Sequence, residues 1–194
     1  DFLCRAMVGY HRQREAAGFA NARVENALHC PWDDECDNED TSLSRCWVYL
    51  HAQSAASYSP ATYAEFVHPY NVPLAELFGK VYYHGCEDLT RKVDTIRKLP
   101  NLREFHVSPW SQVAPISEAL PEHVVMEVHS HPTNVLLLWG EDEMRRELEG
   151  LCSDAGEHLF NLKLCDIQTV NADGGEALIT WSRVARQVAA EHRG

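Results

Sequence analysis

Short apolar runs alternate with amphipathic stretches through the second half of the chain. The runs begin near Val81, Leu102, Val124 and Leu159 and are rich in β-branched and aromatic residues. Between them, apolar residues recur at the spacing of one face of a helix. Successive strand–helix units joined by short turns predict an α/β fold, in which a parallel sheet has helices outside it.

The pattern before residue 81 is less regular. It predicts a helix over residues 1–18 that ends at Gly18, a short strand over 22–28, a polar loop over 29–45 and a strand over Trp47–His51. The length of 194 residues predicts a single domain over residues 1–194.

Further helices follow from caps and apolar spacing. Ser59 and Pro60 should open one as cap and first-turn proline, Pro69 should bend or break it, and a helical piece should continue to Gly79. A later helix is predicted by the apolar series Leu89, Val93, Ile96 and Leu99.

Composition and charge narrow the function classes. A net charge of −12 argues against a surface for nucleic acid or anionic membranes. No apolar run approaches the length of a membrane span, and the first residues lack the order of a secretory signal. Seven irregularly spaced cysteines favour reduced thiols and a cytoplasmic setting. Because the chain begins at Asp1, we expect it to be a piece of something larger.

Polar residues gather where the predicted strands end. In parallel sheets with outer helices, ligands bind beyond the carboxyl ends of the strands. The residues at these ends are His84, Cys86, Glu87, Ser108, Trp110, His129, His131, Cys165 and Asp166. Their convergence predicts an active or metal site there, with a small-molecule substrate.

The pair His84 and Cys86 is the strongest metal candidate. Residues two apart in a strand point to the same side, so the two side chains share one cavity if the strand persists to Cys86. Both are good zinc ligands, and a third from elsewhere would leave an open coordination position. The alternative is that a buried histidine and a reduced cysteine pack at a strand end. His106 is interpreted as a strand residue near the interior, not as a ligand.

The remaining strand-end residues are candidates for contacts with substrate, cofactor or metal. Glu87 could orient an imidazole, although an acidic residue in the first turn of the next helix is equally expected from the helix dipole. Trp110 could form the base of a pocket for a flat ligand, or it could pack against the next helix. One of His129 and His131 should contact substrate or metal. Glu87, His131 and Asp166 are therefore candidate catalytic residues, and Trp110 and His129 candidate cofactor contacts.

Several short motifs occur in an order that resembles the uroporphyrinogen decarboxylase superfamily, especially its poorly characterised members. They are Tyr83–Glu87, Asn101–Arg103, Ser108–Trp110, Phe160–Leu162 and Asp166–Val170, with Ser59-Pro60, Glu65-Phe66 and Pro69-Tyr70 upstream. The resemblance extends from about Ser44 to the C-terminus.

The resemblance implies a (β/α)₈ TIM-type barrel of which this chain holds the C-terminal half. The strands starting near Val81, Leu102, Val124 and Leu159 would be the last four of that barrel. An open half-barrel leaves unpaired strand edges. We therefore expect either a missing N-terminal half or pairing with a second copy of the chain.

The superfamily implies two chemistries. One is methyl transfer between a corrinoid carried by a partner protein and a thiol, with zinc held by a His-x-Cys pair and a distant cysteine. His84 and Cys86 match the pair, and Cys165 is the candidate for the distant ligand, with Asp166, His129 or His131 as substitutes.

The other chemistry is metal-free decarboxylation of a tetrapyrrole. The decarboxylase has a Gly-His-Gly turn after its Phe-Asn-Leu strand, and here Lys163-Leu164-Cys165 stands in its place. We therefore favour zinc-dependent methyl transfer, with decarboxylation as the alternative. An inactive fragment or binding subunit is a third hypothesis.

Overall fold

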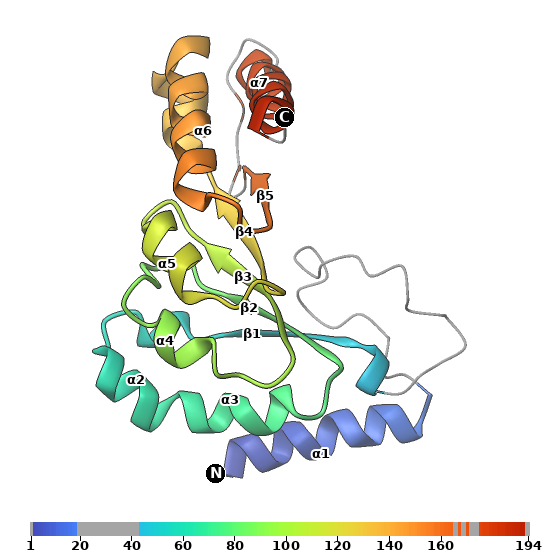
Figure 1. The fold of residues 1–194 in the computed structure, drawn as a ribbon. Coiled ribbons are helices and arrows are strands. Elements are labelled where there is room, and N and C mark those ends of the chain that lie inside the picture. Colours follow the sequence, from blue (N-terminus) through green and yellow to red (C-terminus); the bar gives the residue numbers. More distant parts are fainter. Residues whose placement is uncertain (1, 19–42, 165–166, 168–169, 171–174, 193–194) are drawn as a thin grey trace.

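Five parallel strands form the centre of the molecule. The computed structural model describes residues 2–18, 43–164, 167, 170 and 175–192. The strands lie side by side in their order along the chain (Figure 1). They are β1 (Trp47–His51), β2 (Lys80–His84), β3 (Leu102–Val107), β4 (Val125–His129) and β5 (Phe160–Lys163). The predicted α/β fold with a parallel sheet is confirmed.

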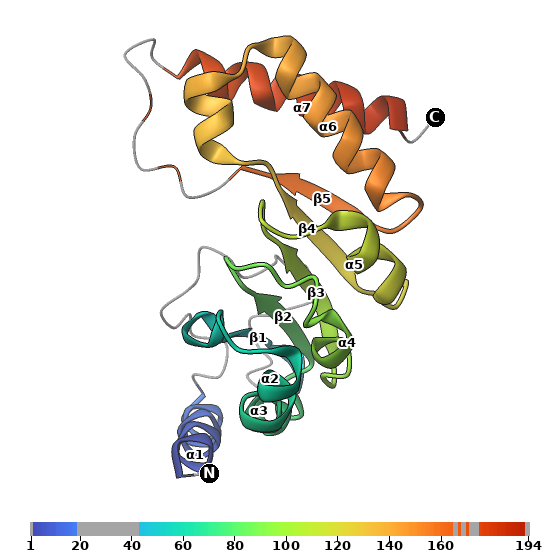
Figure 2. The ribbon, with the colours of Figure 1, turned by 90° about the vertical axis from the view of Figure 1, so that its left-hand side faces the viewer.

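Helices flank the sheet along one face, as the two views in Figures 1 and 2 show. They are α1 (Phe2–Ala16), α2 (Pro60–Phe66), α3 (His68–Ala75), α4 (Val93–Ile96), α5 (Val113–Ala119), α6 (Glu141–Ala155) and α7 (Glu176–His192). Short 3-10 turns at Leu43–Arg45 and Gln53–Ala55 and a π-helical turn at Asn134–Leu138 complete the described elements. Helix α1 packs against α3, and α6 packs against α7 beside β4 and β5.

The start of α2 follows from its cap. Ser59 is extended, and its Oγ accepts a hydrogen bond from the backbone N–H of Thr62 at 3.1 Å. Pro60 occupies the first turn, where a missing N–H costs nothing. Val67 separates α2 from α3, whose first turn contains Pro69. The predicted cap and the predicted interruption at Pro69 are both confirmed.

One condition set by the sequence is not met, because strand β2 ends at His84 and does not persist to Cys86. Two predicted helix lengths were wrong. The helical piece expected to continue to Gly79 ends at Ala75 in α3. The segment carrying Leu89 and Leu99 is α-helical only over Val93–Ile96, although all four apolar residues of its series are buried. Side-chain hydrogen bonds compete with helix formation at its start, where Asp88 accepts from the N–H of Thr90 at 2.9 Å.

Several predictions lie outside the described residues. These are the strand over 22–28, most of the loop over 29–45, and the two strand-end residues Cys165 and Asp166.

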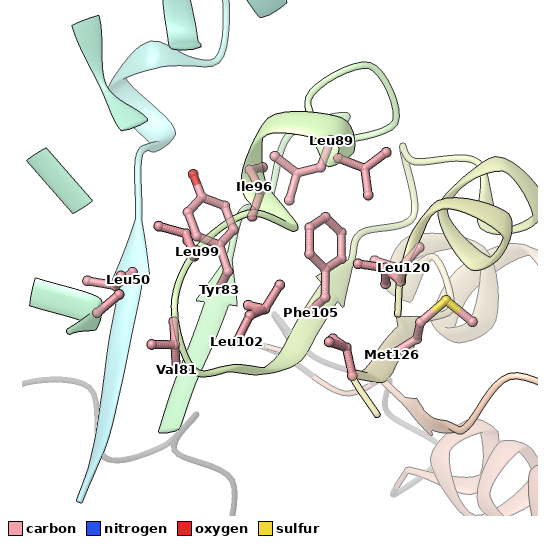
Figure 3. Packing of buried hydrophobic residues seen from close by; sticks show 14 of the residues in the cluster. Leu50, Val81, Tyr83, Leu89, Ile96, Leu99, Leu102, Phe105, Leu120 and Met126 are labelled. Atoms are coloured by element: carbon pink, nitrogen blue, oxygen red, sulfur yellow. The ribbon is translucent and has the colours of Figure 1, made fainter. Parts of the chain in front are cut away.

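The face of the sheet covered by helices is apolar. Val81, Tyr83, Phe105 and Met126 share one buried cluster with residues from the covering helices and loops (Figure 3). Leu102 joins the same cluster although it lies three residues from Phe105. An irregularity in the β2–β3 pairing between Val81 and Tyr82 inserts one residue of β3, which restores the alternation.

No helix in the described part of the chain combines the length and the apolar character that a bilayer crossing needs.

Candidate functional site

The face opposite the helices carries a repeated polar pattern. In β2, β3 and β4, a hydrogen-bonding residue is followed two positions later by a histidine: Tyr82 and His84, Glu104 and His106, Glu127 and His129. The register places Tyr82 opposite Glu104 and His106 opposite Glu127. All six side chains are almost completely buried. The alternation of the strands therefore builds one polar layer across the sheet.

His84 and Cys86 lie together, as predicted. The Sγ of Cys86 is 3.8 Å from Nε2 of His84, although Cys86 lies beyond the end of the strand. Between them the chain passes close to other side chains, since a Cβ at Gly85 would come within 2.8 Å of a Glu87 oxygen and 3.0 Å of Leu89. The side-chain proximity that the metal hypothesis requires is thus present.

His106 completes this group. One nitrogen of each imidazole and the Cys86 sulfur all lie within 4.8 Å of one another, and the ring centroids of His84 and His106 are 4.1 Å apart. The interpretation of His106 as an interior strand residue is correct for its position, but it overlooked this proximity to both candidate ligands. We call His84, Cys86 and His106 the thiolate cluster, after the form that a cysteine takes when it binds a metal.

Glu127 lies beside the thiolate cluster at the centre of a hydrogen-bond network. Its Oε1 accepts from the Tyr82 hydroxyl at 2.6 Å, and it lies 2.7 Å from Nε2 of His129 and 3.3 Å from Nδ1 of His106. Lys163 donates to the other oxygen. Burial by itself raises the pKa of Glu127, but the hydrogen bonds from these four side chains outweigh it and hold the pKa far below its usual range. Glu127 is therefore ionised despite being fully buried.

Glu104 has the opposite character. Burial first, and repulsion from the Glu127 carboxylate second, raise the pKa of Glu104 from 4.5 to about 7. The Nδ2 of Asn161 donates to its Oε1 at 3.2 Å, which offsets part of this shift. Two carboxyls on neighbouring strands thus differ in protonation near neutral pH, a pattern found in acid–base sites.

The imidazoles form a row across the sheet. His106 lies between its neighbours, with ring centroids 4.1 Å from His84 and 4.2 Å from His129. Tyr49 of β1 extends the row, 5.2 Å from the ring of His84. His129, a predicted cofactor contact, belongs to a second possible metal group with His106 and Glu127.

Glu87 does not lie at an imidazole. It is buried near Lys92, with 3.8 Å between Oε1 and Nζ, and neither carboxylate oxygen has a hydrogen-bond partner among the described residues. The alternative based on the helix dipole fails as well, because α4 begins only at Val93. Within the described residues, the carboxylate that contacts imidazoles is Glu127.

Trp110 and His131, which follow the carboxyl ends of β3 and β4, pack against each other. Their ring centroids are 4.8 Å apart in an edge-to-face arrangement, and Trp110 is largely exposed. His131 is in neither metal group. Trp110 therefore presents an exposed aromatic surface next to the ends of the strands. The catalytic role of His131 stays a prediction.

The end of β4 is held in place from outside the sheet. The Oγ of Ser130 donates to Glu147 of α6 at 2.7 Å and accepts from the indole N–H of Trp181 of α7 at 3.1 Å. Because Ser130 follows His129 directly, these bonds fix the strand end that carries the imidazole.

Sequence reasoning missed Glu104 and Glu127 and undervalued His106. The available signal was the repeat of a glutamate, an apolar residue and a histidine in two consecutive strands, Glu104–His106 and Glu127–His129. Its meaning depends on the register, because only the pairing of His106 with Glu127 brings the two motifs into contact.

A cavity lies away from this layer. It has a volume of about 750 Å³ and is lined by residues 156–162 at and before β5 and by Trp181, Ala185, Ala189 and His192 of α7. It therefore borders the outer strand of the sheet and not the thiolate cluster.

Comparisons with known proteins give no identification. No family model matches the sequence, and a search of curated proteins finds no match either.

Proposed function

We propose that this chain is an enzyme of the uroporphyrinogen decarboxylase superfamily that transfers a methyl group to a thiol with the help of zinc. The observation that carries the proposal is the thiolate cluster, in which Cys86, His84 and His106 bring their donor atoms within 4.8 Å of one another. Sulfur and imidazole nitrogen are preferred zinc ligands, and three protein ligands keep one position open. Cys165 and Asp166, which lie outside the described residues, remain candidates for the third ligand in place of His106.

The donor set fits the chemistry. Zinc in the cluster would hold a substrate thiol in its nucleophilic thiolate form. Cys86 supplies one negative charge, and two neutral imidazoles add none. The near-complete burial of His84 and His106 excludes bulk water from that side of the centre.

The transfer itself balances without a redox partner. The thiolate sulfur forms a bond to the methyl carbon, while the bond from that carbon to its donor breaks and its electron pair stays with the donor. The proposed donor, on the basis of the resemblance, is a methylated corrinoid carried by a partner protein, which leaves in its reduced, demethylated form.

We further propose that the sheet is half of a (β/α)₈ barrel. Three features support this: the strands pair in sequential order, the helices cover one face, and the polar layer occupies the other. The other half would come from additional sequence or from a second copy of the chain.

Metal analysis tests the central claim. The purified protein should contain close to one zinc per chain, and cobalt added after chelation should give the charge-transfer absorption of a thiolate ligand. Cys86→Ser should remove that absorption and weaken metal binding by more than about tenfold. Cys152→Ser is the matched control, since Cys152 is a buried thiol on α6. A protein without metal, or a Cys86→Ser variant that binds cobalt like the wild type, would exclude the proposal.

Activity is tested with methylcobalamin and a small thiol as probes. The wild type should demethylate methylcobalamin faster than the Cys86→Ser variant does, and the visible absorbance of the corrinoid reports the reaction. Equal rates for the two proteins would argue against methyl transfer at this cluster, even if metal binds.

A second candidate function is favoured by Glu104. A carboxyl that keeps its proton near neutral pH beside the ionised Glu127 could act as an acid in the metal-free decarboxylation that the resemblance offers as the alternative. The two candidates differ in their metal requirement. Turnover of a uroporphyrinogen by chelated protein would favour decarboxylation, and loss of all activity on chelation would favour methyl transfer.

A further inference from the structure

We propose that Glu127 is a positioning residue that fixes the tautomer of His106 and so presents the Nε2 of this histidine as a metal ligand. The inference rests on the proposed function, because it concerns how the thiolate cluster is prepared for metal. It assigns a role to a residue that the resemblance does not supply.

The hydrogen bonds of Glu127 have a defined direction. The Tyr82 hydroxyl donates to one of its oxygens and the Lys163 ammonium group to the other, so the carboxylate acts as an acceptor. The Nδ1 of His106 at 3.3 Å and the Nε2 of His129 at 2.7 Å from Oε1 are then the nitrogens that carry the proton. A neutral imidazole protonated at Nδ1 has its lone pair on Nε2. The contact with Glu127 therefore selects the tautomer in which His106 can bind metal through Nε2 only.

Glu127 itself is not a metal ligand in this arrangement. A carboxylate has about four acceptor positions. Glu127 meets the donors of Tyr82, His106, His129 and Lys163. One of these donors is an ammonium group, which repels a cation. The group of His106, Glu127 and His129 is therefore a support for the thiolate cluster and not a second metal site.

His106 lies between the rest of the thiolate cluster and the side chains around Glu127. Its ring centroid is 4.1 Å from that of His84 and 4.2 Å from that of His129. It is the one residue shared by both groups of potential ligands in the described part of the chain. A carboxylate that holds the far nitrogen of a ligating histidine both orients the ring and raises its basicity.

The test is Glu127→Gln, which keeps the shape of the side chain but introduces an N–H group. We expect cobalt affinity to fall by about 10- to 100-fold. The thiolate absorption of the saturated variant should remain, because Cys86 and His84 are unchanged. Glu147→Gln is the control, since this carboxylate accepts from Ser130 and not from an imidazole. A folded Glu127→Gln variant that binds cobalt with wild-type affinity would overturn the inference.

A measurement on the unmodified protein covers the case in which the variant does not fold. Nitrogen NMR of the labelled, metal-free wild type distinguishes the two imidazole tautomers. Protonation of His106 at Nδ1 supports the inference, and protonation at Nε2 overturns it. A wild type that binds no cobalt would refute the proposed function and the inference with it. Normal binding by the wild type and by Glu127→Gln would refute the inference alone.

Discussion

Two buried glutamates on adjacent strands show how strongly local partners decide the state of a carboxyl group. Glu127 meets hydrogen-bond donors on both oxygens and stays ionised. Glu104 is also buried, but it has the anionic Glu127 as a neighbour and receives a hydrogen bond from the neutral amide of Asn161. Because the repulsion and the burial outweigh the attraction of the Lys163 ammonium group, Glu104 holds its proton to a higher pH.

This difference predicts a pH-dependent effect of Glu104→Gln on stability. The pKa of Glu104 is about 7 in the folded chain against an ordinary value of 4.5. Between these values the folded state keeps a proton that the unfolded state has released, so the contribution of Glu104 to stability falls as the pH rises. The glutamine side chain of the variant does not titrate, so its own contribution is insensitive to pH. Relative to the wild type, the free energy of unfolding of the variant should therefore rise by up to roughly 3 kcal/mol between about pH 5 and pH 8.

Urea unfolding of the chelated proteins at both pH values measures this gain. Glu118→Gln, at an exposed position of α5, removes the same charge from the surface and should show a much smaller change. A difference between Glu104→Gln and the wild type that is constant with pH would contradict the assignment.

At the scale of elements, the apolar pattern of the sequence predicted the strands of the sheet and most of the helices. The strands from β1 to β5 and the cap of α2 appear where the sequence places them, because each needs only local information. The length of the helical segment after β2 was overestimated. Its apolar spacing requires burial of Leu89, Val93, Ile96 and Leu99, and a chain of turns achieves that burial as well as a continuous helix does.

The polar layer shows the limit of such patterning. His84 and Cys86 were predicted as a pair because both lie on one segment. The contacts of His106 with Glu127 depend on the register of β3 against β4, and a register cannot be obtained from one strand alone. The irregularity between Val81 and Tyr82 adds a shift of one residue that the sequence did not indicate.

The turn before β1 packs closely against the start of β2. Gly79 lies between α3 and β2, and a Cβ there would be 1.9 Å from the backbone oxygen of Ser44. Because that neighbour is backbone, Gly79→Ala must displace the turn at Leu43–Arg45 and should destabilise the fold by about 1–3 kcal/mol.

Gly150→Ala gives the matched control, because Gly150 lies within α6 and a Cβ there meets nothing within 4 Å. This change should stabilise the protein by roughly 0.5–1 kcal/mol, since alanine is the better helix former. Urea unfolding of both variants is the measurement. If Gly79→Ala were as stable as the wild type, the described packing of the turn against the start of β2 would be wrong.

At the scale of the whole molecule, the sheet is unequal across its width. The residues of β2, β3 and β4 are mostly buried, whereas every residue of β5 is only half-buried. The strand order gives β5 one neighbour, β4, within the described residues. The cavity of about 750 Å³ between β5 and α7 lies at this edge. A further strand–helix unit from another polypeptide segment would cover both the edge of β5 and this cavity.

If a second copy of this chain supplies that cover, a charge in the cavity should separate the copies. Ala189 of α7 lines the cavity and is half-buried, so Ala189→Lys would place an ammonium group where apolar surface should pack. We expect the wild type to sediment as a dimer and Ala189→Lys as a folded monomer. Ile179→Lys is the control, because Ile179 is an exposed apolar residue of the same helix outside the cavity lining. A monomeric wild type at high concentration would show that no second copy covers the edge and would favour another polypeptide segment as its cover.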